Sequence, residues 1–326
     1  LFTEQDSIDF DPALVYIRRR IIKMSQKSLK YRVLLKAFRL LPVKKIMSAP
    51  TEKTQKVFRL AYKGEDIPKL HDPELSISTG KVNGSSVLFY RHRQGTNRLG
   101  IYLVGGGMLK YPKPSQAKGL IMLAKESGMD ILLPYYPILF SGASLPDVYE
   151  MLYVLYKMAL RKYKPENICF MGGSSGGNLA IGMVSYINEK GEGLPMPGKI
   201  YAGSPGTLLL TKEEKEKADG LEKTDVVMSV KALETVWDGM TGGKPVPDYM
   251  KYLQLGNYTG LKDVYMSFGG DEVFLAGADS IRKRLEEYGV HVTVEVGDGM
   301  YHSYAMMPLV EEAQEGYRHF MDYIKS

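Results

Sequence analysis

Cysteine is almost absent from this chain of 326 residues, whose only one, Cys169, sits inside an apolar run. A single cysteine cannot build a disulfide framework or a thiolate metal cluster, and it does not indicate an oxidising compartment. The first residues, LFTEQDSIDFDP, are acidic and unlike a signal peptide, so we expect a cytoplasmic location. Because the chain begins with Leu rather than Met, the question whether a segment has been removed upstream stays open.

Long hydrophobic runs and cofactor fingerprints are missing as well. No stretch approaches the roughly 18 consecutive apolar residues of a membrane span. The sequence has no G-x-G-x-x-G fingerprint, no Walker loop and no H-E-x-x-H motif, which argues against dinucleotide, nucleotide and zinc chemistry. We therefore expect no cofactor and no metal ion. With 44% hydrophobic and 25% charged residues, the chain can bury a large core and is typical of an ordinary globular protein.

Acidic residues are missing from residues 12–51, which hold many Lys and Arg, although the whole chain carries a formal charge of only +6. Apolar residues recur there at roughly helical spacing, which predicts a pair of basic amphipathic helices. They are Leu14, Ile17, Ile21, Met24, Tyr31, Leu34, Phe38 and Leu41. We favour helices packed over the protein with solvated charges. Contact with an anionic membrane surface stays open, whereas no aromatic-basic motif indicates nucleic acid.

From about residue 76 onward, strands and helices alternate along the chain. Residues 76–93 predict a hairpin around Asn83-Gly84, a pair that accommodates positive φ. Further strands are predicted near 98–104, 130–137, 168–171, 199–203, 263–269 and 291–297, and helices near 115–127, 145–163, 178–190, 274–289 and 308–324. This alternation predicts an α/β fold with a mostly parallel central sheet and helices on both faces. Residues 208–255 interrupt it with a charge-rich run and predict an insertion outside the sheet.

A glycine-rich turn, GGSSGG, contains the pattern Gly-x-Ser-x-Gly twice, around Ser174 and around Ser175. An apolar strand runs into the turn and a helix-like run from Asn178 leaves it. A serine there would stand on a sharp strand-to-helix turn at the carboxyl edge of the sheet. The nearby helix N-terminus favours developing negative charge. The pattern indicates a nucleophile, and the alternatives are a turn that only packs tightly or a phosphate cradle.

A nucleophilic serine needs a base, and His302 has the best setting among the five histidines. It follows the strand VTVEV and the loop GDGMY, just beyond the carboxyl end of a strand, where the serine is also expected. His291 lies within an alternating strand. The remaining histidines, which lack a glycine-rich or strand-end setting, are His71, His92 and His319. We predict His302 as the base.

The base in turn needs a carboxylate, and the segment SFGGDE offers Asp271 directly after a Gly-Gly pair at a strand end. The chain order Ser174, Asp271, His302 matches the order expected for this kind of fold. Glu272 is the nearest competitor and Asp298 a more distant one. We predict Asp271 as the acid.

Backbone amides near the serine would complete such a site. Gly105-Gly106-Gly107 follows the strand IYLV and can approach a ligand closely because no side chain intervenes. The amide after the nucleophile would add a second source of donors for an oxyanion. Taken alone, a triple glycine is more often just a loop.

Four motifs in this order resemble the hormone-sensitive-lipase-like esterases, the α/β-hydrolase fold-3 family, over residues 98–326. They are YLVGGG, GGSSGGNLA, GGDEVFLAGADSIRKRLEEYGV and GMYHSY. The resemblance implies the α/β-hydrolase fold. It places the nucleophile at Ser174, because Asn178 and Leu179 fix the register of the turn. It also implies that the amides of Gly106, Gly107 and Ser175 form the oxyanion hole.

In that family, an N-terminal helical segment and an insertion before the acid strand form a cap over the site. The resemblance therefore implies a basic helical cap segment at residues 1–62 and a cap insertion at residues 208–255. The hydrolase core would then consist of residues 63–207, with the nucleophile and oxyanion loop, and residues 256–326, with the acid and His302.

The chain departs from the family at three places near the expected site. Val104 stands where the family usually has His, and Gly173 stands where it usually has Asp. The segment PYYPI at residues 134–138 replaces the usual Asp-Tyr-Arg-Leu-Ala-Pro. None of these changes removes a predicted triad member, so the mechanism carries over more firmly than the substrate class.

The predicted function is hydrolysis of small to medium acyl esters by a carboxylesterase-type serine hydrolase through an acyl-enzyme intermediate. A small-molecule ester is the expected partner. Two alternatives stay open: a non-catalytic small-molecule binding protein on the same fold, and an amidase or peptidase with the same triad. The sequence does not decide the oligomeric state, and a dimer is one of the alternatives.

Overall fold

One large sheet organises the part of the chain that the computed structural model describes, which is residues 19–22, 27–41, 43–61, 64–138, 141–241 and 245–326. In these residues the strand order is β1-β9-β8-β7-β6-β4-β5-β3-β2. The strands are β1 Arg19–Ile22, β2 Leu75–Val82, β3 Ser85–His92, β4 Leu99–Leu103, β5 Asp130–Pro134, β6 Ile168–Gly173, β7 Lys199–Gly203, β8 Asp263–Gly269 and β9 His291–Gly297. Only the β2–β3 and β3–β5 pairs are antiparallel. The predicted α/β fold with a mostly parallel sheet is confirmed.

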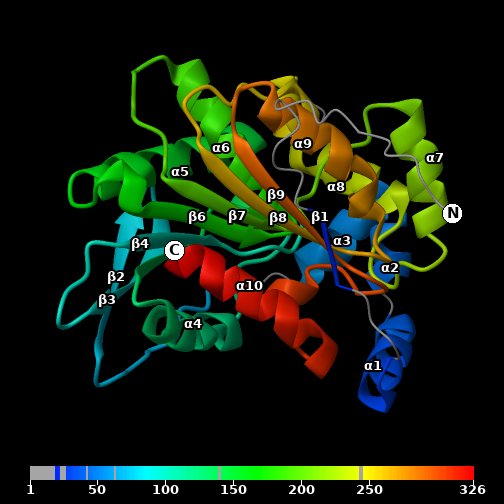
Figure 1. The fold of residues 1–326 in the computed structure, drawn as a ribbon, viewed down its shortest axis with the longest axis horizontal. Helices are drawn as coiled ribbons and strands as arrows, with labels where there is room; N and C mark the ends of the chain where they lie inside the picture. Colours follow the sequence, from blue (N-terminus) through cyan, green and yellow to red (C-terminus); the bar gives the residue numbers. More distant parts are fainter. Residues whose placement is uncertain (1–18, 23–26, 42, 62–63, 139–140, 242–244) are drawn as a thin grey trace, which may run out of the picture.

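Helices cover both faces of the sheet, with α5, α6 and α9 on one side and α4 and α10 on the other (Figure 1). The helices are α1 Leu29–Leu40, α2 Val43–Met47, α3 Thr51–Ala61, α4 Pro114–Ser127, α5 Leu145–Leu160, α6 Ser175–Lys190, α7 Lys212–Leu221, α8 Val230–Thr241, α9 Ala278–Glu286 and α10 Gln314–Lys325. Helices on both faces bury every central strand. This burial explains why β6 is a continuous apolar run rather than an alternating one.

Local signals in the sequence set the ends of several elements. Asn83 and Gly84 take φ values of 47° and 81° between β2 and β3, which is the turn that a tight hairpin requires. Helix α5 begins after Ser144, whose backbone N–H donates to Asp147 Oδ2 at 2.7 Å. Helix α4 ends at Gly128 in the left-handed region, with a φ of 66°. These turns fix where each strand delivers its carboxyl end.

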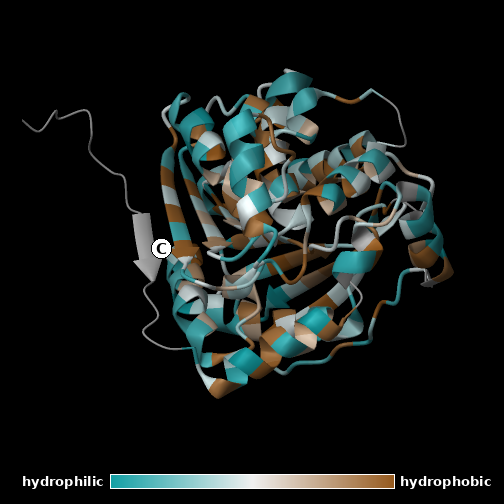
Figure 2. Ribbon diagram, turned by 90° about the vertical axis from the view of Figure 1, so that its right-hand side faces the viewer, coloured by the Kyte–Doolittle hydropathy of each residue, from teal (hydrophilic) through white to brown (hydrophobic). Residues whose placement is uncertain are grey.

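The core lies on both sides of the sheet and is rich in tyrosine and methionine. Figure 2 shows brown, hydrophobic segments in the central strands and more teal on the helices that surround them. Cys169 is buried in this core, as expected. No helix among the described residues is long and apolar enough to cross a bilayer.

Two predicted helices differ from the structure. Arg19–Ile22, expected to be helical, is strand β1, which pairs in parallel with the outer edge of β9. A strand edge offers unpaired N–H and C=O groups, and the β-branched Ile21 and Ile22 suit a strand. Leu14, Ile17 and Met24 of the same prediction lie outside the described residues. The last helix begins at Gln314 rather than Pro308, after a short 3-10 turn at Glu311–Ala313.

Helices from two distant parts of the sequence meet above the carboxyl edge of the sheet. Helices α2 and α3 pack against α8, and α7 packs against the short 3-10 turn Val273–Gly277. Asp225, between α7 and α8, joins this layer to the sheet because its Oδ2 accepts from the N–H of Val273 at 2.8 Å. Ser174 and His302 lie at the same edge of the sheet, beneath this layer.

Candidate active site

Ser174 stands at the turn between β6 and α6 in a backbone conformation that few non-glycine residues adopt. Its φ is 56° and its ψ is −125°. Two hydrogen bonds hold the turn: the N–H of Ser174 donates to Gly203 O at 2.7 Å, and its carbonyl accepts from the N–H of Gly206 at 3.0 Å. Such strain persists only where the surroundings impose it, and it is a feature of functional turns. The predicted strand-turn-helix setting of Ser174 is present.

Close backbone packing explains the glycines around Ser174. A Cβ atom at Gly176 would lie 2.0 Å from the carbonyl oxygen of Leu103 on the neighbouring strand β4. A Cβ atom at Gly172 would lie 2.6 Å from the Gly176 backbone. Larger residues would therefore push α6 away from the sheet and displace Ser174.

His302 is paired with a buried carboxylate. Its Nδ1 lies 2.5 Å from Glu272 Oε2, and Glu272 is completely buried. The ring of Phe274 packs against the imidazole with 4.9 Å between the centroids. A carboxylate on Nδ1 selects the tautomer that leaves Nε2 free to accept a proton.

The prediction of Asp271 as the acid is corrected by this geometry. Asp271 forms a surface ion pair with Lys27, with 3.4 Å between Nζ and Oδ2, and about a third of its side chain is exposed. The chain turns at Gly270, whose N–H donates to Gly297 O at 2.7 Å, and the two carboxylates after it diverge. Asp271 points outward, whereas Glu272 points into the protein and reaches His302. The competitor named from the sequence, Glu272, is therefore the carboxylate that contacts His302.

Ser204, at the end of β7, links this carboxylate to the histidine loop. Its Oγ donates to Glu272 Oε1 at 2.7 Å and accepts from the N–H of Ser303 at 2.8 Å. The N–H of Gly269 donates to the same Oε1 at 2.8 Å. Ser204 is completely buried, and its φ is 47°. Sequence reasoning did not single out Ser204, although its place at a strand end beside the serine turn was a usable signal.

The triple-glycine loop lies directly beside Ser174. A Cβ atom at Gly105 would lie 2.5 Å from Gly173 O and 3.1 Å from Ser174 Cβ, so only glycine allows this approach. Gly106 and Gly107 have φ values of 123° and 64°, which disfavour other residues. Ser175 is the first residue of α6, where a backbone N–H has no partner within the helix. The three residues predicted to donate to an oxyanion thus line one space with Ser174.

Two of the departures from the family motif meet in this loop. Tyr136, from the segment PYYPI, donates a hydrogen bond from its hydroxyl to the carbonyl oxygen of Val104. Burial raises the pKa of the Tyr136 phenol well above its usual value, so the hydroxyl remains a donor at all ordinary pH values. Tyr136 thereby holds the chain at Val104, immediately before the three glycines.

A cavity of about 290 Å³ connects these groups. Ser174, Ser175, His302 and the three loop glycines line its floor, and Phe58 of α3 lies in its wall. The remaining wall is mostly apolar and comes largely from α8 and the residues before it: Val227, Met228, Leu233, Val236, Trp237 and Met240. Among the lining residues, Lys110, Gln116 and Met307 are exposed and mark the mouth. Within the described residues, no cluster of acidic, histidine and cysteine side chains could hold a metal ion.

Comparison with known proteins places this arrangement in a family. The model of the alpha/beta hydrolase fold family Abhydrolase_3 matches residues 101–306, which include the glycine loop, the serine turn and the histidine loop. The chain belongs to the α/β-hydrolase fold family. The resemblance drawn from the four motifs is confirmed.

Curated relatives of this α/β-hydrolase include two proteins of Mycobacterium tuberculosis. Esterase LipU is 28% identical over 71% of this chain and 78% of its own length. Carboxylesterase/phospholipase LipF is 26% identical over 72% of this chain and 64% of its own length.

Solved structures with the same fold cover nearly the whole chain. A putative esterase from Staphylococcus aureus superposes with a TM-score of 0.76 at 21% identity, over 90% of this chain and 99% of the other. An esterase from the bacterial hormone-sensitive lipase family gives a TM-score of 0.73 at 18% identity, over 92% and 98% of the two chains. At these identities the superpositions establish the fold of this α/β-hydrolase.

Proposed function

We propose that this α/β-hydrolase is a carboxylesterase that cleaves small to medium acyl esters, with Ser174 as nucleophile, His302 as base and Glu272 as acid. The observation that carries the proposal is that His302, paired with the buried Glu272, lines the same cavity as a serine held at positive φ. A ligand-binding protein needs no carboxylate-oriented base beside a serine on a strained turn. The esterase names of the mycobacterial relatives agree with this chemistry.

The reaction would proceed in two halves that use the same groups. Ser174 Oγ attacks the ester carbonyl carbon while His302 Nε2 takes its proton, and Glu272 stabilises the imidazolium that forms. The amides of Gly106, Gly107 and Ser175 would hold the oxyanion of the tetrahedral intermediate. His302 then gives the proton to the leaving alcohol as the ester C–O bond breaks, which leaves the acyl group on Ser174 Oγ. Water, deprotonated by His302, attacks the acyl carbon, and His302 returns the proton to Ser174 Oγ as the carboxylic acid leaves.

The cavity supports an apolar acyl or alkyl group of limited size. Its volume of about 290 Å³ lies at the lower end of ligand pockets, and aliphatic, methionine and aromatic side chains dominate the wall from α8. We also propose residues 1–62 and 208–255 as the cap and residues 63–207 and 256–326 as the hydrolase core, except that Arg19–Ile22 forms strand β1 of the central sheet. A cytoplasmic location also stays a proposal, resting on the presence of a single cysteine in the 326 residues.

A panel of p-nitrophenyl esters from acetate to palmitate, run beside the matching anilides, tests this proposal. We expect measurable hydrolysis of short and medium esters, a decline for the longest chains, and much slower cleavage of anilides. Ser174→Ala is the control and should lower kcat at least about 10³-fold, because it deletes the attacking oxygen atom.

Two other outcomes would replace the proposal. Anilides cleaved as fast as esters would indicate an amidase or peptidase. Saturable binding of esters without turnover, in a protein whose far-UV circular dichroism shows a folded chain, would indicate a binding protein.

A further inference from the structure

Helix α1 has two apolar faces, and the described part of the protein buries only one of them. On the inner face, Tyr31 is completely buried and packs with Leu34, Leu35 and Phe38 in a cluster with Tyr301 and Tyr304. The ring of Phe38 meets Tyr301 edge to face at 5.5 Å. One apolar face is sufficient to attach a helix to a protein, so the opposite face needs a different explanation.

The outward face carries three exposed large apolar residues at helical spacing. Leu29, Val33 and Leu40 are 69%, 57% and 85% exposed. Val33 and Leu40 lie four and eleven residues after Leu29, and this spacing places all three on one side of the helix. Tyr31 and Phe38 lie on the opposite side. Leu41, at 52% exposure, follows directly after the helix. We call Leu29, Val33 and Leu40 the outer stripe.

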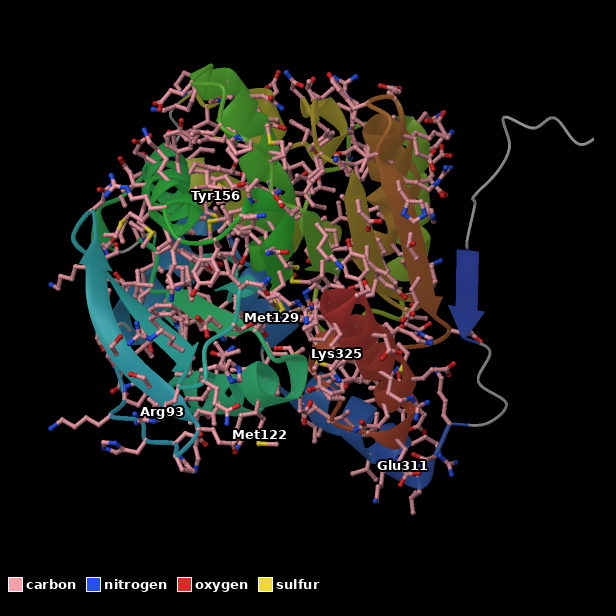
Figure 3. The ribbon with its side chains drawn as sticks, turned by 60° about the vertical axis from the view of Figure 1, so that its left-hand side comes forward. Arg93, Met122, Met129, Tyr156, Glu311 and Lys325 are labelled. Atoms are coloured by element: carbon pink, nitrogen blue, oxygen red, sulfur yellow. The ribbon has the colours of Figure 1, made fainter. Side chains whose placement is uncertain are left out.

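Cations surround the outer stripe, and α1 contains no acid. Lys36 lies within the stripe, and Arg32 and Arg39 lie along one of its sides. Within the described part of the chain, no carboxylate forms an ion pair with these three side chains, while Lys30 on the other side is 3.9 Å from Glu311. The labelled Glu311 lies beside α1 in Figure 3. As far as the described residues show, the helix thus presents exposed leucine and valine side chains among positive charges that mostly have no acidic partner.

The inner face of α1 rests on the loop that carries His302. The Tyr31 hydroxyl donates to the carbonyl oxygen of Gly299, and Tyr301 stacks on Tyr31 with 6.2 Å between the ring centroids. Beyond His302 the chain continues through Met307 and Leu309, which are 43% and 59% exposed. Met307 also lines the cavity mouth, so exposed apolar residues extend from near α1 to the entrance of the site.

We propose that the outer stripe and its cations dock α1 on an anionic lipid surface. Leucine and valine side chains that enter the boundary of the acyl chains, beside Lys and Arg that face lipid phosphates, form the pattern of an interfacial helix. A second copy of the chain fits less well, because it would bring two cationic faces together. Docking would set the mouth at Met307 near the surface. If the proposed ester hydrolysis is correct, lipid-borne esters are then a substrate class.

Sedimentation with vesicles tests docking without any measure of catalysis. The probes are vesicles of phosphatidylcholine alone and of equal parts phosphatidylcholine and phosphatidylglycerol, at low and high salt. We expect binding to the anionic vesicles that weakens with salt. The variant Arg32→Gln/Lys36→Gln/Arg39→Gln should bind on the order of 100-fold more weakly, since each cation adds about fivefold to the affinity at such a surface. The variant Leu29→Gln/Val33→Gln/Leu40→Gln should lose more than about tenfold.

Control variants place two changes of each kind, apolar to Gln and cation to Gln, elsewhere on the surface. Met122→Gln on α4 and Met158→Gln on α5 alter residues that are 56% and 48% exposed. Lys81→Gln on β2 and Arg93→Gln, directly after β3, remove two cations far from α1 in the sequence. These controls should bind vesicles as the unmodified protein does. Glutamine keeps a good helix propensity, so circular dichroism should be unchanged for both α1 variants.

Three results would overturn docking: no binding of the unmodified protein to anionic vesicles at low salt, binding that both α1 variants retain, or a dimer that light scattering shows to dissociate in the α1 variants. Hydrolysis of soluble p-nitrophenyl butyrate should be equal in all variants. Vesicle binding without any hydrolysis would leave docking in place and remove the proposed function. Hydrolysis without vesicle binding would do the reverse.

Discussion

Two neighbouring carboxylates, Asp271 and Glu272, occupy opposite environments. Glu272 accepts hydrogen bonds from Ser204 and Gly269 and lies 2.5 Å from His302, whereas Asp271 pairs with Lys27 at the surface. A surface ion pair contributes roughly 0–1 kcal/mol, and its loss would hardly affect a reaction. The two residues therefore make a matched pair of positions for mutation.

Glu272→Gln should lower kcat by about 10⁴-fold, because the amide cannot hold the productive tautomer of His302 or stabilise its cation. Asp271→Asn, which removes only the surface ion pair, should change kcat less than about threefold. Steady-state kinetics on a soluble ester measures both. Equal losses of kcat in the two variants would contradict the role assigned to Glu272. A greater loss in Asp271→Asn would show that the two carboxylates have been assigned the wrong way round.

Ser204 offers a second test at the scale of single residues. Ser204→Ala removes the donor to Glu272 and the acceptor for Ser303, so the Glu272–His302 pair loses its support. We expect kcat to fall by roughly 10- to 100-fold with KM nearly unchanged, as for other supporting hydrogen bonds.

Ser204→Gly separates the hydroxyl from the backbone, because glycine accepts the φ of 47° without strain. Both variants should lose kcat to a similar extent. If the glycine variant kept full activity, the effect of alanine would come from backbone strain, and the positioning role of the hydroxyl would be refuted.

At the scale of elements, the turn from β6 into α6 depends on glycines that let the helix approach the sheet. Gly176→Ala would bring a methyl group within 2.0 Å of Leu103 O, a backbone atom that cannot move freely. We expect a loss of roughly 3 kcal/mol in the free energy of unfolding. A thermal melt followed by circular dichroism measures it as a fall in Tm.

Gly119→Ala is the control for this change, since Gly119 lies inside α4, is exposed, and a methyl group there would have no other atom within 4 Å. Alanine at this position should raise the free energy of unfolding by roughly 0.5–1 kcal/mol. A Gly176→Ala variant as stable as this control would mean that α6 does not lie as close to β4 as described.

The elements also show which parts of the fold the sequence could predict. The hairpin at Asn83-Gly84 and the buried strand β6 carry their own local signals, and both are present. Strand β1 could not be predicted, because Arg19–Ile22 is a strand only through pairing with β9, near the other end of the chain. Similarly, which of Asp271 and Glu272 faces His302 depends on the turn at Gly270. A one-residue change in direction leaves no mark in the amino-acid pattern.

At the scale of the whole molecule, Cys169 reports on the integrity of the core. It is buried in β6, and burial raises the pKa of its thiol to about 12. The thiolate is the reactive form, so iodoacetamide at about pH 8 should modify less than about 5% of the native protein in an hour. In urea above the unfolding transition, modification should be complete. Rapid alkylation of the native protein would contradict a closed core around the sheet.

The proposal that Ser174 is an activated nucleophile is tested most directly by labelling with a fluorophosphonate, followed by peptide mass mapping. The probe reacts with activated serines and requires no guess about the ester. We expect one adduct per chain, on Ser174, and much slower labelling in Glu272→Gln. An adduct on Ser175 would move the nucleophile by one residue. No adduct in a folded protein with an accessible cavity would contradict a working serine hydrolase and favour a ligand-binding protein.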